Sequence, residues 1–319
     1  MKIVILERNS VGTDISVDAI GRYGEVTAYA NTTGEEAAGR IADADIVIAN
    51  KTPLNESTLK DAGNVKLICL FATGYDNVDL KYCKSRGIKV ANVVNYSTDA
   101  VAQHTFALCL YLLEKLRHYD DYVKSGQYAA QDRFSNFDIP YTELAGKTWG
   151  IIGMGNIGRK VGRIAQAFGC RVIFHSVTGK SDCTQYERVD FETLLAQSDF
   201  LSLHCPLSSL TRDLINLEAL RKMKKSAILI NVARGPVVND ADLYTALTEG
   251  EIAAAGLDVT GTEPMRESNP LSRFTDSGRL IITPHMAWAS IEARTRCVEE
   301  TCRNIESFRQ GVYRNIVNC

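Results

Sequence analysis

A glycine-rich segment in the middle of the chain places the strongest constraint on its fold. The apolar run 148–152 leads into the pattern Gly-x-Gly-x-x-Gly, and a stretch with helical periodicity follows as far as Phe168. The first glycine permits a tight turn, the second lets a pyrophosphate approach the backbone, and the third lets the helix pack on the strand. The helix N-terminus then offers its N–H groups to phosphate. The sequence therefore predicts a dinucleotide-binding loop formed by Gly153, Gly155, Asn156, Ile157 and Gly158.

Apolar runs rich in β-branched residues recur along the chain, with helical stretches between them. They lie at 2–6, 45–49, 67–71, 89–93, 148–152, 171–175, 200–204, 227–232, 254–259 and 280–283. Most lack alternation with polar residues, as parallel strands covered on both faces do. A chain of 319 residues also exceeds the usual size of one domain. These features predict two α/β domains with doubly wound parallel sheets.

Three segments outside the strands bear on how the domains are divided. Residues 97–115 read as a long apolar helix, in which His104 is interpreted as a core residue. Residues 119–146 are polar and lack a clear period, which indicates a surface excursion or an arm onto another subunit. Residues 291–309 have helical periodicity and no strand after them. That last helix is compatible with either domain.

Composition excludes several classes of protein. Lys and Arg number 36 against 38 Asp and Glu, for a net charge of −2 without a basic block, which argues against nucleic acid and anionic membranes as partners. The most apolar long stretch, 102–113, is too short and too interrupted by polar residues to span a bilayer. Nine scattered cysteines without a Cys-x-x-Cys pair favour a reduced, cytoplasmic protein. No residues show metal-ligand spacing, so no metal is expected.

The second strand of the nucleotide-binding unit departs from the usual pattern. An acid that holds the adenosine ribose is expected at its end. The chain has Ser176 there, followed by Thr178 and Lys180. A hydroxyl does not repel a 2′-phosphate, and a lysine can pair with one. The sequence therefore slightly favours NADP(H) and leaves NAD(H) open.

Three later segments carry side chains suited to one reaction. They are 230–235, 256–263 and 283–288, each at or just after the carboxyl end of an expected strand, where ligands bind in open α/β sheets. Arg234 can form a fork with the carboxylate of a 2-oxo acid. His285 can protonate the alkoxide that hydride arrival at C2 creates. Glu263 can orient that histidine.

With these motifs the chain resembles the D-isomer-specific 2-hydroxyacid dehydrogenase family. The resemblance covers nearly the whole chain and includes Ala-Thr-Gly-Tyr-Asp-Asn-Val-Asp at 72–79, the glycine loop, Cys-Pro-Leu at 205–207, Asn-Val-Ala-Arg-Gly at 231–235, Gly-Leu-Asp-Val at 256–259, Glu-Pro at 263–264 and Thr-Pro-His at 283–285. It implies that Arg234 binds substrate, that His285 is the acid/base and that Glu263 is its partner. The segments 137–140 and 286–289 most resemble the glycerate dehydrogenase and hydroxypyruvate/glyoxylate reductase branch of the family. The expected activity is therefore NAD(P)H-dependent reduction of a small 2-oxo acid.

The same resemblance implies further binding residues. Asp258 is expected to contact the nicotinamide amide, and the backbone of 72–74 to receive the substrate carboxylate. The residues expected to bind cofactor beyond the glycine loop are Thr73, Ser176, Thr178, Lys180, Cys205, Pro206, Val232, Ala233 and Asp258. Those expected to bind substrate are Asn50, Lys51, Ala72, Thr73, Gly74, Arg234, His285 and Trp288.

The resemblance also implies a domain organisation and an assembly. Residues 1–98 and 289–319 would form a discontinuous, flavodoxin-like substrate domain, and the Rossmann nucleotide domain 99–288 would be inserted into it. The arm around 119–146 would mediate a homodimer. Thr260-Gly261-Thr262 departs from the family pattern before Glu263. Relatives that act as transcriptional corepressors keep the same three groups, so a nucleotide-sensing interaction protein is the alternative function.

Overall fold

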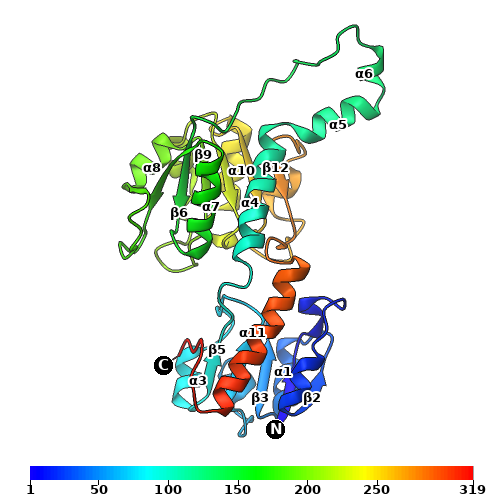
Figure 1. The fold of residues 1–319 in the computed structure, drawn as a ribbon, viewed down its shortest axis with the longest axis vertical. Helices are drawn as coiled ribbons and strands as arrows, with labels where there is room; N and C mark the ends of the chain where they lie inside the picture. Colours follow the sequence, from blue (N-terminus) through cyan, green and yellow to red (C-terminus); the bar gives the residue numbers. More distant parts are fainter. Residues whose placement is uncertain (319) are drawn as a thin grey trace. The chain divides into compact units, whose positions relative to one another are not determined.

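The computed structural model describes residues 1–318, and the chain divides into two compact units. Unit 1 consists of Met1–Ser97 together with the described residues from Trp288 onward, and unit 2 is Thr98–Ala287. Each unit has its own parallel sheet covered by helices (Figure 1). Within residues 1–318, no helix is long and apolar enough to cross a membrane.

Unit 1 has a five-stranded parallel sheet in the order β2-β1-β3-β4-β5. The strands are β1 (Lys2–Ile5), β2 (Glu25–Ala28), β3 (Ile46–Ala49), β4 (Leu67–Leu70) and β5 (Lys89–Ala91). The helices are α1 (Gly34–Ile41), α2 (Glu56–Leu59), α3 (Leu80–Ser85) and α11 (Ile291–Arg309), with 3-10 turns at Arg8–Val11 and Asp18–Tyr23. This is the flavodoxin-like order of a doubly wound sheet.

The helix α11 belongs to unit 1, which answers a question that the sequence left open. The Ser290 side chain accepts a hydrogen bond from Ala293 N and so caps the helix. The buried residues of α11 pack against β4. After the helix the chain returns to the sheet edge, where Val317 N donates to Val90 O. Burial and backbone pairing together fix the C-terminal segment to unit 1.

Unit 2 has a seven-stranded parallel sheet in the order β12-β11-β10-β9-β6-β7-β8. The strands are β6 (Thr148–Ile152), β7 (Arg171–His175), β8 (Glu187–Arg188), β9 (Phe200–Leu203), β10 (Ile228–Asn231), β11 (Ala254–Leu257) and β12 (Leu280–Ile282). The helices are α4 (Thr98–Leu113), α5 (Leu116–Lys124), α6 (Gln127–Ala130), α7 (Asn156–Ala167), α8 (Phe191–Gln197), α9 (Leu217–Lys222) and α10 (Asp240–Glu249), with 3-10 turns at Gly235–Val237 and Pro270–Arg273. The strand order reverses beside β6, as in a Rossmann domain. The predicted fold class, two doubly wound parallel-sheet domains, is confirmed.

An aromatic cluster packs one face of the central strands of unit 2. Trp149 on β6 is fully buried, and its ring centroid lies 4.6 Å from that of Phe106 on α4 and 5.4 Å from that of Phe200 on β9. Its indole N–H donates to Ser202 Oγ at 2.9 Å. A buried tryptophan with a satisfied N–H anchors α4 on the sheet. It thereby fixes the strand whose carboxyl end carries the glycine loop.

The arm in unit 2 contains regular structure that the sequence analysis did not predict. The expectation for 119–146 was a segment without a helical period, but α5 and α6 occupy its first part. Neither helix has a buried residue, but the apolar side chains of α5 do recur at helical spacing, a pattern that the sequence analysis overlooked. Ion pairs one turn apart, Asp120 with Lys124 at 2.6 Å and Arg117 with Asp121 at 3.5 Å, also lie along α5. Figure 1 shows the arm leading away from the sheet of unit 2 and back to it.

Candidate active site

The glycine loop joins β6 to α7, and its glycines have separate steric roles. Gly153 has φ +94°, and a Cβ there would lie 2.7 Å from the backbone of 204–205. A Cβ on Gly158 would lie 2.2 Å from Gly153 O. A Cβ on Gly155, by contrast, would meet nothing within 4 Å. Gly153 and Gly158 thus lie where the backbone leaves no room for a side chain. Gly155 leaves open space above a helix N-terminus, as a bound pyrophosphate requires.

A cavity of about 300 Å³ lies over this loop. Its lining includes seven of the predicted cofactor residues, which are Gly153, Gly155, Ser176, Thr178, Lys180, Cys205 and Pro206. Asn156, Ile157 and Gly158 form the first turn of α7. The sequence analysis missed the other lining residues, which are Met154, Val177, Ser181, Asp182, Ser208 and Thr211. Val232, Ala233 and Asp258 follow β10 and β11 in the same sheet, outside this lining.

The end of β7 is polar and contains an ion pair that the sequence did not reveal. Ser176 is 9% exposed, and its carbonyl accepts from Gly179 N in a turn that presents Thr178 and Lys180. Arg159, near the start of α7, pairs with Asp182, which lines the cavity. An acid therefore does stand near the expected position, but a guanidinium offsets its charge.

Two residues directly after β9 have suppressed ionisation. Burial lowers the pKa of His204 to about 3, so its imidazole is neutral. Burial raises the pKa of the Cys205 thiol to about 11, so the thiol stays protonated. A protonated thiol is a poor nucleophile. The geometry favours packing beside the loop as the role of Cys205.

Three adjacent parallel strands deliver the predicted chemical groups to one sheet edge. In the register, Asn231 on β10 lies beside Leu257 on β11, and Leu257 lies beside Ile282 on β12. Arg234, Asp258 and His285 each come one to three residues after these positions. The structure therefore brings the predicted groups together at the carboxyl ends of neighbouring strands.

Two further contacts connect these loops. Gly235 abuts the loop that holds Glu263, because a Cβ on Gly235 would lie 1.7 Å from Thr260 O. Glu263 Oε2 lies 2.6 Å from His285 Nδ1, and Thr260 N donates to Glu263 Oε1 at 3.3 Å. The side chains of His285 and Glu263 are 25% and 33% exposed. The predicted acid/base and its carboxylate are thus in direct contact and open to a ligand on one side.

Asp258 is the internal support of the loop that carries His285. Its side chain is 1% exposed. Oδ1 accepts from the Thr283 hydroxyl at 2.6 Å and from Met286 N at 2.8 Å, and Oδ2 accepts from Ala287 N at 2.8 Å. A buried carboxylate needs such donors to remain charged. The expected contact of Asp258 with a nicotinamide amide stays a prediction.

The turn that carries Arg234 is held by its own backbone and by Asn231. Asn231 Nδ2 donates to Arg234 O at 3.0 Å, and its Oδ1 accepts from Ala233 N at 3.0 Å. Arg234 Nη1 donates to Ala233 O at 2.7 Å. Asn231 is a positioning residue that the sequence analysis quoted only as part of a motif.

The remaining predicted substrate residues lie in unit 1, and all of them except Trp288 follow the carboxyl ends of its strands. Asn50 and Lys51 follow β3, and the loop 72–74 follows β4. The Thr73 hydroxyl donates to Val93 O at 2.8 Å. Trp288 packs edge-on against the ring of Tyr96 at 6.0 Å between centroids. These residues belong to unit 1, whereas Arg234, Glu263 and His285 belong to unit 2.

Glu7 is a residue of unit 1 that the sequence analysis did not single out as part of the site. It is 8% exposed, and its carboxylate accepts from the backbone N–H groups of Asn50, Lys51 and Thr52 at 2.6–2.8 Å. A buried carboxylate at the end of β1 thus fixes the loop that carries two predicted substrate residues. The only sequence signal is an acid directly after an apolar strand, which many surface loops share.

Metal and disulfide chemistry have no visible support in the part of the chain that the structure describes. Residues 1–318 contain no group of three or more His, Cys, Asp or Glu side chains that could hold a metal ion. Their eight cysteines are free and buried.

Comparison with known proteins gives one family from sequence and from structure. Residues 106–287 match the family described as D-isomer specific 2-hydroxyacid dehydrogenase, NAD binding domain. The chain is 38% identical over 325 residues to hydroxypyruvate reductase from Blautia hydrogenotrophica, covering 100% of both proteins. It is 39% identical over 317 residues to glycerate dehydrogenase from Methylorubrum extorquens, covering 99% of this chain and 98% of that one.

Solved structures with the same fold include two complexes with nicotinamide cofactors. D-lactate dehydrogenase from Aquifex aeolicus, complexed with NAD and lactic acid, has a TM-score of 0.86 at 29% identity, covering 100% of this chain and 99% of that one. An acyclic imino acid reductase in complex with NADPH and D-Arg has a TM-score of 0.89 at 30% identity, covering 99% of this chain and 100% of that one.

Proposed function

The chain belongs to the D-isomer-specific 2-hydroxyacid dehydrogenase family of NAD-dependent oxidoreductases, and we propose that it works mainly as a reductase of a small 2-oxo acid such as hydroxypyruvate or glyoxylate. The observation that carries the proposal is the 2.6 Å contact between His285 Nδ1 and Glu263 Oε2, beside the loop of Arg234. The names of the similar proteins support the choice of substrate.

The glycine loop fits a dinucleotide, because Gly155 borders open space at a helix N-terminus. When bound, the nicotinamide supplies or accepts the hydride at C2 of the substrate. His285 donates a proton from Nε2 to the oxygen on C2, since Nδ1 is engaged by Glu263. Arg234 pairs with the substrate carboxylate, and we assign the backbone of 72–74 to the same group. In the oxidative direction His285 takes the proton back.

A direct assay tests the proposed activity. The purified chain is mixed with NADH or NADPH and, in turn, glyoxylate, hydroxypyruvate, pyruvate and phenylpyruvate, and the loss of reduced-nicotinamide absorbance is followed. We expect turnover with the small acids and a lower kcat/KM with phenylpyruvate. Absence of oxidation with all four acids and both cofactors would contradict the proposal.

The partner of the acid/base gives a pH-dependent prediction. Reduction needs protonated His285, and the Glu263 carboxylate stabilises that positive charge. Glu263→Gln removes the charge, so we expect the high-pH limb of the kcat profile to move to lower pH, with a loss in kcat smaller than that of removing the histidine. The profile of kcat against pH is measured for the wild type, for this variant and for a control variant. Glu267→Gln, in the same exposed loop, is the matched control, and a profile shared by all three enzymes would refute the pair.

For the cofactor, we propose that NADPH supports turnover at least comparably with NADH. Ser176 ends β7 where a ribose-binding acid would repel a 2′-phosphate, and Thr178 and Lys180 line the same cavity. The nearby acid, Asp182, is paired with Arg159. Both cofactors occur in solved structures of the same fold.

A charge substitution tests this cofactor choice. We expect Ser176→Asp to shift the ratio of kcat/KM towards NADH by about an order of magnitude or more, since a charge against a partly desolvated phosphate costs over about 1 kcal/mol. Ser176→Asn is the matched neutral control and should shift the ratio far less. Lys180→Ala should weaken NADPH alone, and more so at low salt, where screening is least. Strict NADH dependence of the wild type would overturn the preference.

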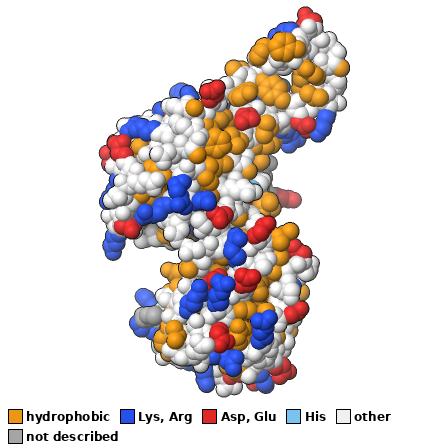
Figure 2. Space-filling model, viewed as in Figure 1, with side chains coloured by type: hydrophobic (Ala, Val, Ile, Leu, Met, Phe, Trp, Pro, Cys, Tyr) orange, Lys and Arg blue, Asp and Glu red, His pale blue; other side chains and the backbone are white. Residues whose placement is uncertain are grey.

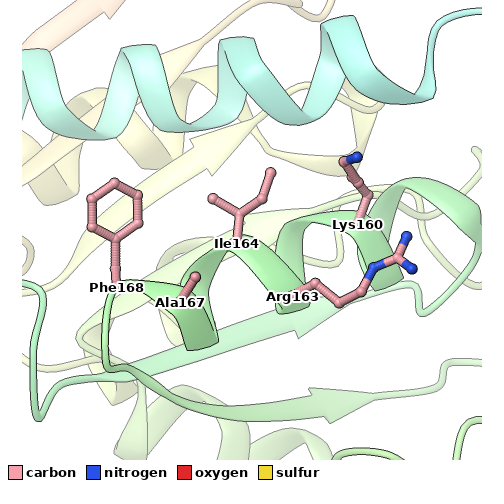
Figure 3. Close-up of a pocket in the computed structure, with 5 residues that line it drawn as sticks. All are labelled: Lys160, Arg163, Ile164, Ala167 and Phe168. Carbon is pink, nitrogen blue, oxygen red and sulfur yellow. The ribbon is translucent and has the colours of Figure 1, made fainter.

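We also propose that the protein assembles as a homodimer through its arm. Figure 2 shows hydrophobic side chains on the surface of the arm. From the start of α5 onward, the exposed large apolar residues of this region are Leu116, Val123, Tyr128, Phe134, Phe137 and Tyr141. A surface groove of about 450 Å³ runs along α7 in the same unit, lined by Lys160, Arg163, Ile164, Ala167 and Phe168 (Figure 3). Exposed apolar patches of this kind mark association surfaces. Sedimentation velocity of the purified chain measures its oligomeric state, and we expect a dimer; a monomer would contradict the proposal.

A further inference from the structure

A histidine on α4 lies against the buried carboxylate that supports the catalytic loop. His104 Nε2 is 2.9 Å from Thr283 Oγ1 and 3.5 Å from Asp258 Oδ1. The His104 side chain is 16% exposed. Neither the proposed proton transfer nor the binding of substrate uses this residue. It nevertheless contacts the turn that carries His285, through Thr283 and the Asp258 carboxylate.

The direction of the hydrogen bonds follows from the single proton of the Thr283 hydroxyl. That hydroxyl lies 2.6 Å from Asp258 Oδ1, an acceptor, so it donates to the carboxylate. Its oxygen is then left as an acceptor towards His104, whose Nε2 must carry the proton and donate. Leu257 O, at 3.4 Å, is a competing acceptor for the hydroxyl. Donation from His104 therefore keeps the threonine turned towards Asp258.

Asp258, at the end of this chain of hydrogen bonds, supports His285, whose backbone is strained. His285 has φ +53°, in the left-handed region that residues with a side chain rarely adopt. Asp258 restrains it from both sides of the turn. Its backbone oxygen accepts from His285 N at 2.8 Å, and its carboxylate accepts from Met286 N and Ala287 N. Such conformations persist where surrounding contacts over-determine them.

We propose that His104 is a positioning residue for the acid/base: through Thr283 it orients the Asp258 carboxylate, and through that carboxylate it holds His285 against Glu263. The inference rests on the proposed function, in which His285 transfers a proton. It assigns no contact between His104 and the substrate. The expected consequence of losing His104 is a misplaced proton donor.

His104 is suited to this role because it stays neutral. Burial lowers its pKa, and the facing Asp258 carboxylate, the charged group placed against it, acts in the opposite direction. A neutral imidazole with its proton on Nε2 presents one fixed donor to Thr283. The role is therefore one of geometry, and we expect no separate titration of His104 in the kinetics near neutral pH.

Two amide substitutions with different reach test the proposal. The side-chain nitrogen of glutamine can occupy the place of Nε2, whereas that of asparagine falls near Nδ1 and cannot reach Thr283. We expect His104→Asn to lower kcat about tenfold, the effect of one hydrogen bond of ordinary strength. The substrate KM should change little, and the high-pH limb of the kcat profile should move to lower pH. His104→Gln should retain kcat within about threefold and keep the wild-type profile.

A double substitution separates positioning from a general loss of packing. Thr283→Val removes the hydroxyl that transmits the effect, so its loss of kcat and that of His104→Asn should not add when the two are combined. Fully additive losses would overturn the proposed chain of bonds. Equal kcat and equal pH profiles in the wild type and His104→Asn would overturn it as well.

A measurement on the wild type covers the case in which the variants fold poorly. Nitrogen-15 NMR of the histidine side chains reports which ring nitrogen is protonated, and we expect the proton of His104 on Nε2. A proton on Nδ1 would overturn the inference whatever the variants do. A wild type that reduces none of the 2-oxo acids would overturn the proposed function and this role together. Activity that depends on His285 but not on His104 overturns this role alone.

Discussion

His285→Ala is expected to lower kcat for 2-oxo-acid reduction by about two to four orders of magnitude, the usual contribution of a positioned general acid. The alkoxide formed at C2 would have to take its proton from water, without a donor held in place. His285 is three-quarters buried, and its Nδ1 is already committed to Glu263.

Steady-state kinetics at saturating cofactor measure this effect, and titration of nucleotide fluorescence measures cofactor binding. We expect binding to change little, because the cavity over the glycine loop does not include His285. His118→Ala is a suitable control, since His118 lies with Asp276–Arg279 at the amino end of β12, whereas His285 follows its carboxyl end. Near-normal kcat in His285→Ala would exclude it as the acid/base.

The strands that were predictable from sequence are those that both faces of a sheet bury. Ile46–Ala49 and Leu67–Leu70 are fully buried, and their apolar runs indicated parallel strands. The strands β2 and β8 escaped prediction because their side chains are mostly exposed, whereas β5 and β12, which also lie at sheet edges, keep buried apolar residues. Glu25–Ala28 has no buried residue, and Glu187–Arg188 is exposed throughout. Strands with exposed side chains are held by backbone pairing, which leaves little pattern in the sequence.

The residues of the candidate site likewise differ in whether the sequence could predict them. The proximity of groups at strand ends could be predicted from sequence, because parallel strands place their carboxyl ends at one edge of the sheet. The supporting contacts could not, since they join segments that are remote along the chain. Glu7 with 50–52, Arg159 with Asp182, and His104 with Thr283 are examples. His104 was interpreted as a core residue because its helix is apolar, and nothing in the Thr-Pro-His motif after β12 indicates a partner on that helix.

Arg234→Lys is expected to lower kcat/KM about a hundredfold, mainly through a higher KM for the 2-oxo acid. A guanidinium can form a fork with a carboxylate, and hydrogen bonds to charged groups contribute roughly 1.5–3 kcal/mol each. In this structure Arg234 Nη1 also donates to Ala233 O, which helps to close the turn that carries the side chain. Lysine has one nitrogen and cannot hold that carbonyl and grip both carboxylate oxygens together.

The split between kcat and KM decides what Arg234 does. A rise in KM alone means that the side chain binds the carboxylate equally in the ground and transition states. An additional fall in kcat means that it also holds the carbonyl as charge develops on its oxygen. Asn231→Asp is the informative companion variant, because it disturbs the turn and leaves the guanidinium in place. If Arg234→Lys has wild-type kinetics, the arginine only closes its turn, and the substrate carboxylate must be bound by other residues.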